Sequence, residues 1–407
     1  MGQKRKRAAK DGAAAEQTPK KQQKTEEKVE KRTPKAVVAV TALDTSPFLD
    51  NPKGADLKRE VQLYDLLSSE DIEDRLIAAN AVLAGLLGGE GVEESTLQRH
   101  LERRLFRGLA SGRKCARLGF SVVLAEIIGQ LFGTKNLAES KYPGLTFDKV
   151  LGFLIAKTKP DGDLSGQEEK DHFLGLLFGL ESFVGAKILF EEDNKWHIIL
   201  RKFLELAKKK PWTREQCGWV IAGALSQMDQ AQAEYTLEQI HSAGLALSPE
   251  GVGIWITARN RFPDMKFPSK PWGSSGNPLE HLKTLGKALK ESSSDEGSDK
   301  SQQAKQTGNW NAKLHFVWNL VLAQYVAGVQ GKVHGIKSDF ENFWKVAVDG
   351  TRLFLQLVVY EANHRQRISF PRLLQERENS GDFCFSRKSS KTLPPMASFY
   401  PVSLVII

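Results

Sequence analysis

The sequence predicts an all-α fold over most of its 407 residues. From about residue 57 to residue 349 the apolar residues recur with helical spacing, and the alternation typical of strands is missing. Breaks that contain Gly or Pro separate the helical stretches, which follow one another in pairs. Hydrophobic residues make up 41% of the chain, which is enough for a sizeable core. These observations favour helical hairpins that stack side by side.

The first long helical stretch covers residues 70–87, with acidic residues at its start and the run Gly88–Gly91 at its end. The stretch that follows carries two stripes, which lie about 180° apart on a helix. We expect the leucines of one stripe to be buried and the arginines of the other to form a basic surface. The stripes consist of Leu97, Leu101, Leu105 and Leu109, and of Arg99, Arg103 and Arg107.

The next stretch, residues 113–132, is apolar nearly all round, as expected for a helix packed between other helices. Arg113, Lys114 and Arg117 lie at its start, where the helix macrodipole disfavours positive charge. Either acidic side chains of a neighbouring repeat or phosphate groups would compensate these cations. The local pattern does not choose between the two partners, although an internal ladder is the preferred interpretation for Arg113 and Arg117.

The arginine stripe has the same two interpretations, and contact with a nucleic-acid backbone is weighed equally with an internal ladder. No aromatic platform or base-reading motif interleaves these cations, so we expect any contact to be made with phosphates rather than with bases. The candidate nucleic-acid-binding residues are Arg99, Arg103, Arg104, Arg107, Arg113 and Lys114.

A weak internal repeat supports the stacked arrangement. The stretch that begins at Arg75 aligns with the stretch that begins at Arg113, at an offset of 38 residues. This offset is near the ~40–47 residues of HEAT and armadillo repeats. We therefore predict a HEAT/armadillo-like helical repeat solenoid over residues 45–290, continued over 310–350 after a disordered, Ser-rich and acidic insertion at 291–309.

Residues 1–40 are predicted to be a disordered basic tail. Residues 1–35 hold 12 Lys and Arg against five Asp and Glu, which gives +7 of the whole chain's +9, and they contain almost no large apolar side chain. Two basic clusters resemble a bipartite nuclear localisation signal, so we expect import receptors as partners and a nuclear location. The cluster residues are Lys4, Arg5, Lys6, Arg7, Lys20 and Lys21.

No arrangement of residues indicates catalysis, a metal site or a cofactor. The three cysteines are scattered without a CxxC spacing. The segment 161–172 begins like a calcium loop but has His172 where a bidentate Glu is required, so a polar connecting loop is the better interpretation. We expect His315 to pack in the core. The longest apolar run, residues 119–133, contains Glu126 and is shorter than a membrane span of ~18 residues, so no membrane contact is expected.

Three segments, taken in order, resemble one known family. They are RLFRGLASGRKCARLGFSVVLAEII (104–128), KLHFVWNLVL (313–322) and FWKVAVDG (343–350). These segments resemble the DNA polymerase phi/Myb-binding protein 1A family, also called the fungal DNA polymerase V family, and the resemblance covers roughly residues 45–350.

The resemblance implies a nucleolar protein of the helical HEAT/armadillo type, linked to ribosomal-DNA transcription and ribosome biogenesis. Its implied partners are ribosomal DNA or pre-ribosomal RNA and nucleolar proteins. The resemblance does not carry a polymerase active site, so the leading hypothesis is a non-catalytic nucleolar scaffold. A DNA-directed DNA polymerase, as the family name suggests, is the alternative. A nuclear transport adaptor is a third possibility, against which the basic cluster Lys4–Arg7 argues.

The sequence after about Gly350 has no sustained periodicity and departs from the continuation that the family implies. With common codons, a one-base shift near residue 352 restores a serine-rich run like that of the family. We therefore predict that residues 351–407 are an aberrant or disordered tail produced by a frameshift or by mis-splicing.

Overall fold

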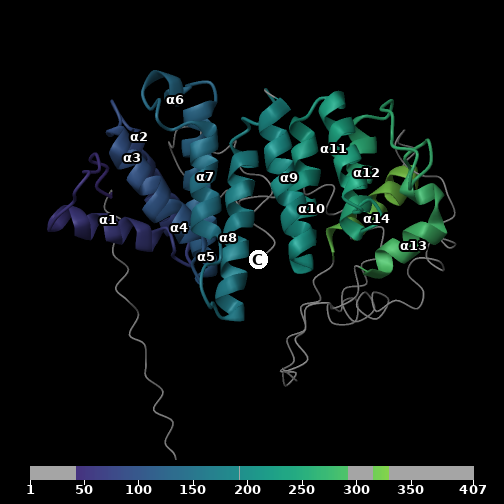
Figure 1. Ribbon diagram of the computed structural model, residues 1–407, viewed down its shortest axis with the longest axis horizontal. Helices are drawn as coiled ribbons and strands as arrows, with labels where there is room; N and C mark the ends of the chain where they lie inside the picture. The colour runs from purple at the N-terminus through teal and green to yellow at the C-terminus, as the bar shows by residue number, and fades with distance from the viewer. Residues whose placement is uncertain (1–42, 192, 292–314, 330–407) are drawn as a thin grey trace, which may run out of the picture. The chain divides into compact units, whose positions relative to one another are not determined.

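The computed structural model describes residues 43–191, 193–291 and 315–329. Every described residue belongs to one compact unit of the chain. All regular elements of the described residues are helical, which confirms the all-α class (Figure 1). The basic tail at 1–40 with its nuclear localisation residues, most of the insertion at 291–309, and residues 330–407 lie outside the described residues.

The helices follow one another with short connections. The first half holds α1 (Ala55–Leu66), α2 (Ile72–Leu87), α3 (Glu94–His100), the π-helical segment η1 (Leu101–Phe106), α4 (Arg107–Leu109), α5 (Lys114–Phe132), α6 (Leu137–Ser140), α7 (Phe147–Thr158) and α8 (Gly166–Gly185). The second half holds α9 (Asp193–Lys209), α10 (Arg214–Ala224), α11 (Gln230–Ser242), α12 (Pro249–Arg261), α13 (Leu282–Glu291) and α14 (Phe316–Val329), with 3-10 turns at Pro211–Thr213, Leu225–Gln227 and Pro278–Glu280.

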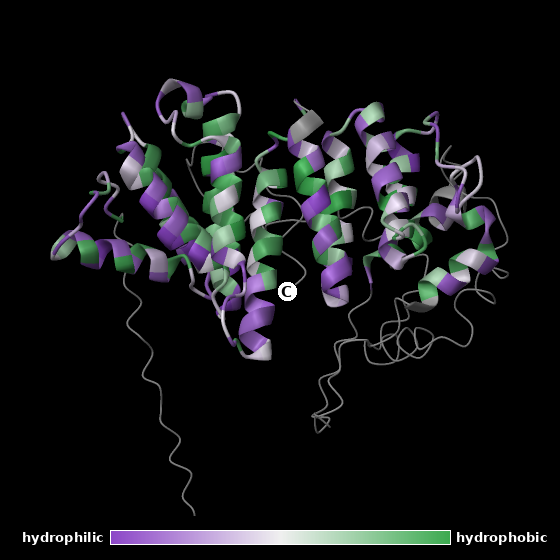
Figure 2. Ribbon diagram, in the orientation of Figure 1, coloured by the Kyte–Doolittle hydropathy of each residue, from purple (hydrophilic) through white to green (hydrophobic). Residues whose placement is uncertain are grey.

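Helix packing proceeds from neighbour to neighbour along the chain. Helix α5 contacts α2 on one side and α8 on the other, α8 contacts α9 and α10, and α10 contacts α12, which contacts α14. Figure 2 shows that α8 changes along its length, from a hydrophilic end to a hydrophobic half. This order is compatible with stacked hairpins, while the HEAT/armadillo type of the array stays a prediction.

The leucine stripe is buried as the sequence predicts. Leu97, Leu101, Leu105 and Leu109 are all fully buried, within a helical run that passes from α3 through η1 into α4. In an uninterrupted α-helix of 3.6 residues per turn, a spacing of four drifts by ~40° per step. The wider π turn of η1 reduces this drift and keeps the leucines on one side.

The packing of helix α5 between two other helices explains why its sequence is apolar on nearly every side. This helix packs between α2 and α8, and its apolar side chains at Ala116, Phe120, Val123, Leu124, Ile127, Ile128 and Leu131 are buried. By length and composition alone this 19-residue helix could cross a membrane, so the prediction that no stretch is long enough was wrong. The helix begins five residues before the apolar run 119–133. Of its most apolar 18-residue stretch, 56% is buried inside the protein.

Two loops have the same hydrogen bonds at an offset of 42 residues. In each loop a serine hydroxyl, of Ser69 or of Ser111, accepts from the backbone amide two residues further on. Nη1 of Arg75 donates to the carbonyl of Ser69 at 2.7 Å, and Nη1 of Arg117 donates to the carbonyl of Ser111 at 2.5 Å. The equivalent of Arg75 is therefore Arg117 and not Arg113, so the predicted offset of 38 was wrong, although 42 also lies within ~40–47.

Of two predicted local features, the core position of His315 is confirmed, whereas the connecting loop predicted for residues 161–172 ends at residue 165, because residues 166–172 form the first turns of α8. Residues 161–165 form the connection before α8, where the Ser165 hydroxyl accepts from the amide of Glu168 and the Glu168 side chain accepts from the amide of Ser165. His315 is buried against Phe316, and its Nε2 lies 3.3 Å from Oε1 of Glu250 in α12. The first segment is thus a capped loop, and the histidine joins α14 to α12.

Gly119 in α5 is required by a close backbone approach. A Cβ added there would overlap the carbonyl oxygen of Leu67, at the end of α1. Replacing Gly119 with Ala is expected to lower the free energy of unfolding by about 2 kcal/mol in urea denaturation, because the backbones must separate. Gly152→Ala is the control, since a Cβ there meets nothing within 4 Å, and it should stabilise α7 by up to about 1 kcal/mol. Equal effects of the two substitutions would contradict this assignment.

Candidate nucleic-acid interface

The candidate interface is organised around Glu60, whose side chain has no solvent-exposed surface. Glu60 lies on the face of α1 that also carries Leu63 and Tyr64, three and four residues further on, and this face is buried. An ionised carboxylate in such a position needs cationic or hydrogen-bonding partners. The run of residues 99–104, across α3 and η1, supplies them.

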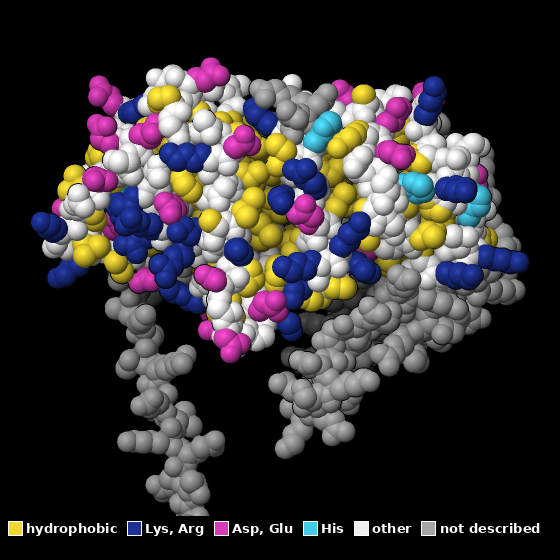
Figure 3. All heavy atoms as spheres, in the orientation of Figure 1, with side chains coloured by type: hydrophobic (Ala, Val, Ile, Leu, Met, Phe, Trp, Pro, Cys, Tyr) yellow, Lys and Arg dark blue, Asp and Glu magenta, His cyan; other side chains and the backbone are white. Residues whose placement is uncertain are grey.

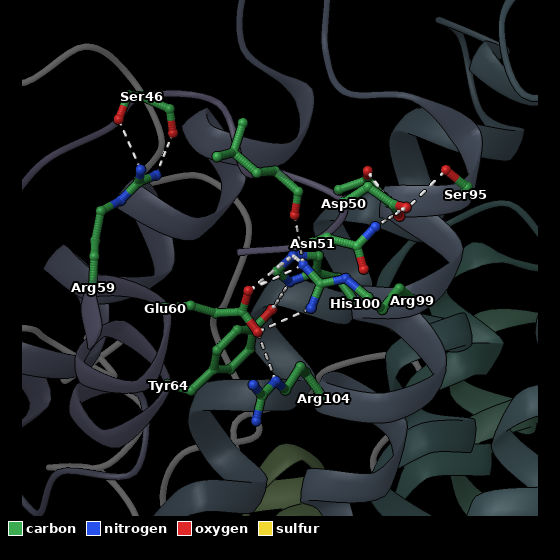
Figure 4. Close-up of polar contacts among 12 residues, drawn as sticks. Ser46, Asp50, Asn51, Arg59, Glu60, Tyr64, Ser95, Arg99, His100 and Arg104 are labelled. Atoms are coloured by element: carbon green, nitrogen blue, oxygen red, sulfur yellow. Dashed lines mark hydrogen bonds and ion pairs between the residues drawn. The ribbon is translucent and has the colours of Figure 1, made fainter. Parts of the chain in front are cut away.

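Two arginines bind the same buried carboxylate (Figure 4). Nη1 of Arg99 donates to Oε1 of Glu60 at 3.1 Å, and Nη2 of Arg99 donates to Oε2 at 3.0 Å. Nε of Arg104 donates to Oε1 at 2.7 Å. The bidentate contact of Arg99 fixes the orientation of both side chains. Arg99 is 17% exposed and Arg104 is 35% exposed, so Arg104 keeps more of its surface in solvent.

The guanidinium of Arg99 also joins the cluster to its surroundings. Its Nη2 donates to the carbonyl of Leu49 at 2.9 Å and lies 2.8 Å from Nε2 of His100. An arginine can only donate, so Nε2 of His100 accepts and the proton of the neutral imidazole resides on Nδ1. Nδ1 then donates to the hydroxyl of Tyr64 at 2.7 Å. Through these bonds α3 holds both α1 and the segment that precedes it.

The electrostatics of the cluster keep Glu60 charged and His100 neutral. Burial alone would raise the pKa of Glu60, but the hydrogen bond from Arg99 and the neighbouring charges lower it below its usual value. Burial lowers the pKa of His100 to about 3, an effect that Glu60 opposes and the nearby arginines reinforce. Burial also raises the pKa of the Tyr64 hydroxyl. The cluster is therefore one carboxylate between two guanidinium groups.

The other two arginines of this run point to solvent. Arg103 in η1 and Arg107 at the start of α4 are exposed. In the part of the chain that the structure describes, neither forms an ion pair. Figure 3 shows Lys and Arg side chains gathered over the region of α1 and α4. The predicted basic stripe is thus divided, because Arg99 faces Glu60 while Arg103 and Arg107 face outward.

The cations at the start of α5 are divided in the same way. Nη1 of Arg117 lies 3.4 Å from Oδ1 of Asp171 in α8, and both side chains are buried. Arg113 also reaches an acid of another helix, Asp65 of α1, at 3.4 Å, but these side chains are 64% and 62% exposed. Lys114 is exposed. The internal-ladder interpretation is therefore confirmed for Arg117, and Arg113 has an exposed partner of the same kind.

The sequence reasoning missed Glu60, His100 and Asp171 as partners of the arginines. The signal for Glu60 was present, because an acid with apolar residues three and four positions later faces the core of an amphipathic helix. The pairing itself was not readable, since 39 residues separate Glu60 from Arg99. Contact of all six predicted residues with nucleic acid stays a prediction.

A comparison with family models and curated proteins gives the identity. The model of the family described as DNA polymerase phi matches residues 100–356. The chain belongs to the DNA polymerase phi family. It is 28% identical over 306 residues to the rDNA transcriptional regulator pol5 of Schizosaccharomyces pombe and 27% identical over 336 residues to the rDNA transcriptional regulator POL5 of Saccharomyces cerevisiae.

The matches cover 72% and 70% of this DNA polymerase phi family chain but 29% and 32% of those two relatives. The chain therefore matches less than one third of each relative's length. No solved structure matches the chain. The described residues include no group of three or more His, Cys, Asp or Glu that could hold a metal ion.

Removing the charge of Glu60 is expected to destabilise this member of the DNA polymerase phi family strongly. Glu60→Gln leaves Arg99 partly buried without its carboxylate, so the free energy of unfolding should fall by about 3 kcal/mol in urea denaturation. Asp65→Asn is the control, because it removes one acid of an exposed ion pair and should cost less than about 1 kcal/mol. Similar losses for the two variants would show that Glu60 does not hold the cluster together.

The neutral His100 should make stability depend on pH. Its folded-state pKa of about 3 lies below the unfolded value of about 6.5, so its contribution is complete above pH 6.5 and is lost as the pH falls toward 3. Within this window the free energy of unfolding should decrease by about 1 kcal/mol per pH unit. The decrease is measured from pH 6.5 to 5 in the parent chain and in His100→Gln, where it should be shallower. Parallel curves would mean that His100 titrates normally.

Proposed function

We propose that this chain acts in rDNA transcription as a non-catalytic nucleic-acid-binding protein of the nucleolus. The observation that carries the proposal is the exposure of Arg103 and Arg107 beside two arginines that Glu60 has already bound. The names of the two fungal relatives supply the process, since both are rDNA transcriptional regulators. The wider role in ribosome biogenesis, with pre-ribosomal RNA and nucleolar proteins as partners, is part of the same proposal.

The geometry favours contact with phosphates. Arg103 and Arg107 are four residues apart in one helical run and lie on neighbouring positions of its surface. Arg113 and Lys114 add two exposed cations at the start of α5, which packs against α4. The exposed pair of Arg113 with Asp65 is weak, so a phosphate can replace the carboxylate at little cost. Such contacts fix the position of a duplex and do not read its sequence.

Arg99 and Arg104 have a different role in this proposal. Their guanidinium groups are held by Glu60, so they fix η1 in place rather than supply the main phosphate contacts. Access to the nucleolus is proposed to depend on import receptors that bind the basic clusters at Lys4–Arg7 and Lys20–Lys21.

The salt dependence of DNA binding tests the interface. Each phosphate neutralised on a duplex contributes about −0.9 to the slope of log K against log salt concentration. The double variant Arg103→Gln/Arg107→Gln should therefore make the slope shallower by about 1.8, as measured by fluorescence anisotropy with a labelled duplex. Lys157→Gln is the control, because Lys157 is paired with Glu102 at 2.9 Å, and it should leave the slope unchanged. An unchanged slope in the double variant would exclude these two arginines as phosphate contacts.

The family description also names a polymerase. A primer-extension assay on the protein preparation used for DNA binding distinguishes a polymerase from a non-catalytic binding protein. The proposal expects no primer extension when the chain is supplied with a primed template, Mg²⁺ and the four deoxynucleotides. Extension that survives purification to homogeneity would favour the DNA-directed DNA polymerase over the non-catalytic binding protein.

A further inference from the structure

The end of α9 carries a second group of unpaired cations. Lys208 and Lys209 lie in the last turn of α9 and are exposed. The neighbouring lysines are paired, since Lys202 lies 2.8 Å from Glu205 and Lys210 lies 2.8 Å from Glu169. Among the described residues, no acidic side chain pairs with Lys208 or Lys209.

Contacts through α8 connect this group to the candidate interface. Asp171 of α8 pairs with Arg117 of α5, and a Cβ on Gly112, just before α5, would lie 3.3 Å from the same carboxylate. Two residues further along α8, the ring of Phe173 lies 5.2 Å from Nζ of Lys209. The start of α5 and the end of α9 therefore flank the same turns of α8.

Three acids in the first turns of α8 already have partners. Glu169 pairs with Lys210, and Asp171 pairs with Arg117. Glu168 accepts from the backbone amide of Ser165 in the cap of α8. In Figure 3 Lys and Arg side chains also gather over α9 and α10, on the face that shows the basic side chains over α1 and α4. One face thus presents two cationic groups.

The spacing of the groups matches a duplex rather than a single phosphate. Packed helices lie 8–10 Å apart, so the two steps from α5 to α8 and from α8 to α9 amount to ~20 Å. Successive phosphates of one strand are 3.4 Å apart along a B-form axis, so ~20 Å corresponds to about 6 base pairs. A longer duplex can reach both groups at once, while a shorter one contacts a single group.

We propose that Lys208 and Lys209 form a second phosphate-contacting group for the duplex DNA that Arg103 and Arg107 bind. This inference rests on the proposed function and extends its surface from α4 and α5 to the end of α9. The alternative is a purely structural role, because lysines in the last turn of a helix stabilise its macrodipole. The two roles differ in their dependence on DNA, since a structural lysine changes stability but not the salt slope of binding.

The test uses the full chain of 407 residues and two DNA probes, a 20-base-pair duplex and a hairpin whose stem of 3 base pairs spans only ~10 Å. On the longer duplex, Lys208→Gln/Lys209→Gln should make the log–log salt slope shallower by about 1.8. The matched control is Lys202→Gln/Lys210→Gln, which removes the same charge from paired lysines and should leave the slope unchanged. On the short stem, the slopes of the parent chain and of Lys208→Gln/Lys209→Gln should agree. Circular dichroism and urea denaturation verify that each variant is folded.

The outcomes separate this inference from the proposed function. If the Arg103/Arg107 variant changes the slope and the Lys208/Lys209 variant does not, the second group is excluded and the first interface stands. If the parent chain binds neither probe, the proposed function itself fails. Equal slope changes in the Lys208/Lys209 variant and in its control would show a general charge effect and would overturn the assignment of a local contact.

Discussion

A carboxylate without exposed surface must be matched by cations, and Glu60 imposes this requirement on the first part of the structure. Two guanidinium groups satisfy it, and they come from positions five residues apart in one helical run. The neutral imidazole of His100 fills the remaining space beside them and binds Tyr64 on α1. Because Arg99 and Arg104 both bind Glu60, α1 cannot move relative to α3 and η1 without leaving a charge unpaired. The cluster around Glu60 thus determines which arginines of the run are left for the surface.

The π-helical turn connects this interior cluster to the proposed function. It keeps Leu101 and Leu105 in the core while Arg104 turns toward Glu60 and Arg103 turns outward. A π turn within an α-helix is rare and is frequently associated with a functional site. Here it separates adjacent arginines, so that one is held inside and the next is available to a polyanion. The same division recurs at the start of α5, where Arg117 is buried with Asp171 and Lys114 is exposed.

Local patterns predicted the helical class, the buried leucine stripe, the core helix after residue 113 and a polar connection at residues 161–165, before α8. They are readable because apolar spacing and capping residues act within a few positions of the chain. The pairing of Arg99 with Glu60 could not be predicted from the sequence, since it joins residues 39 positions apart. The repeat offset was misjudged for a related reason. The sequence alignment matched Arg75 with Arg113, because both lie near the start of a helix. In the structure Arg75 corresponds to Arg117, because each donates a hydrogen bond to a serine carbonyl six residues earlier.

The charge balance of the chain explains why a basic surface must be local. Outside residues 1–35 the net charge is +2. A long positive face therefore requires that acidic side chains form ion pairs with other cations. Glu60 and Asp171 do this inside the protein, and Glu169 and Glu205 do it at the surface by pairing with Lys210 and Lys202. Among the described residues, these ion pairs leave Arg103, Arg107, Lys208 and Lys209 without an acidic partner. Attraction between charges acts over a Debye length of about 8 Å, so it depends on the local charge and not on the total charge. The part of the chain outside residues 1–35 can therefore attract a polyanion at its unpaired cations although it is nearly neutral as a whole.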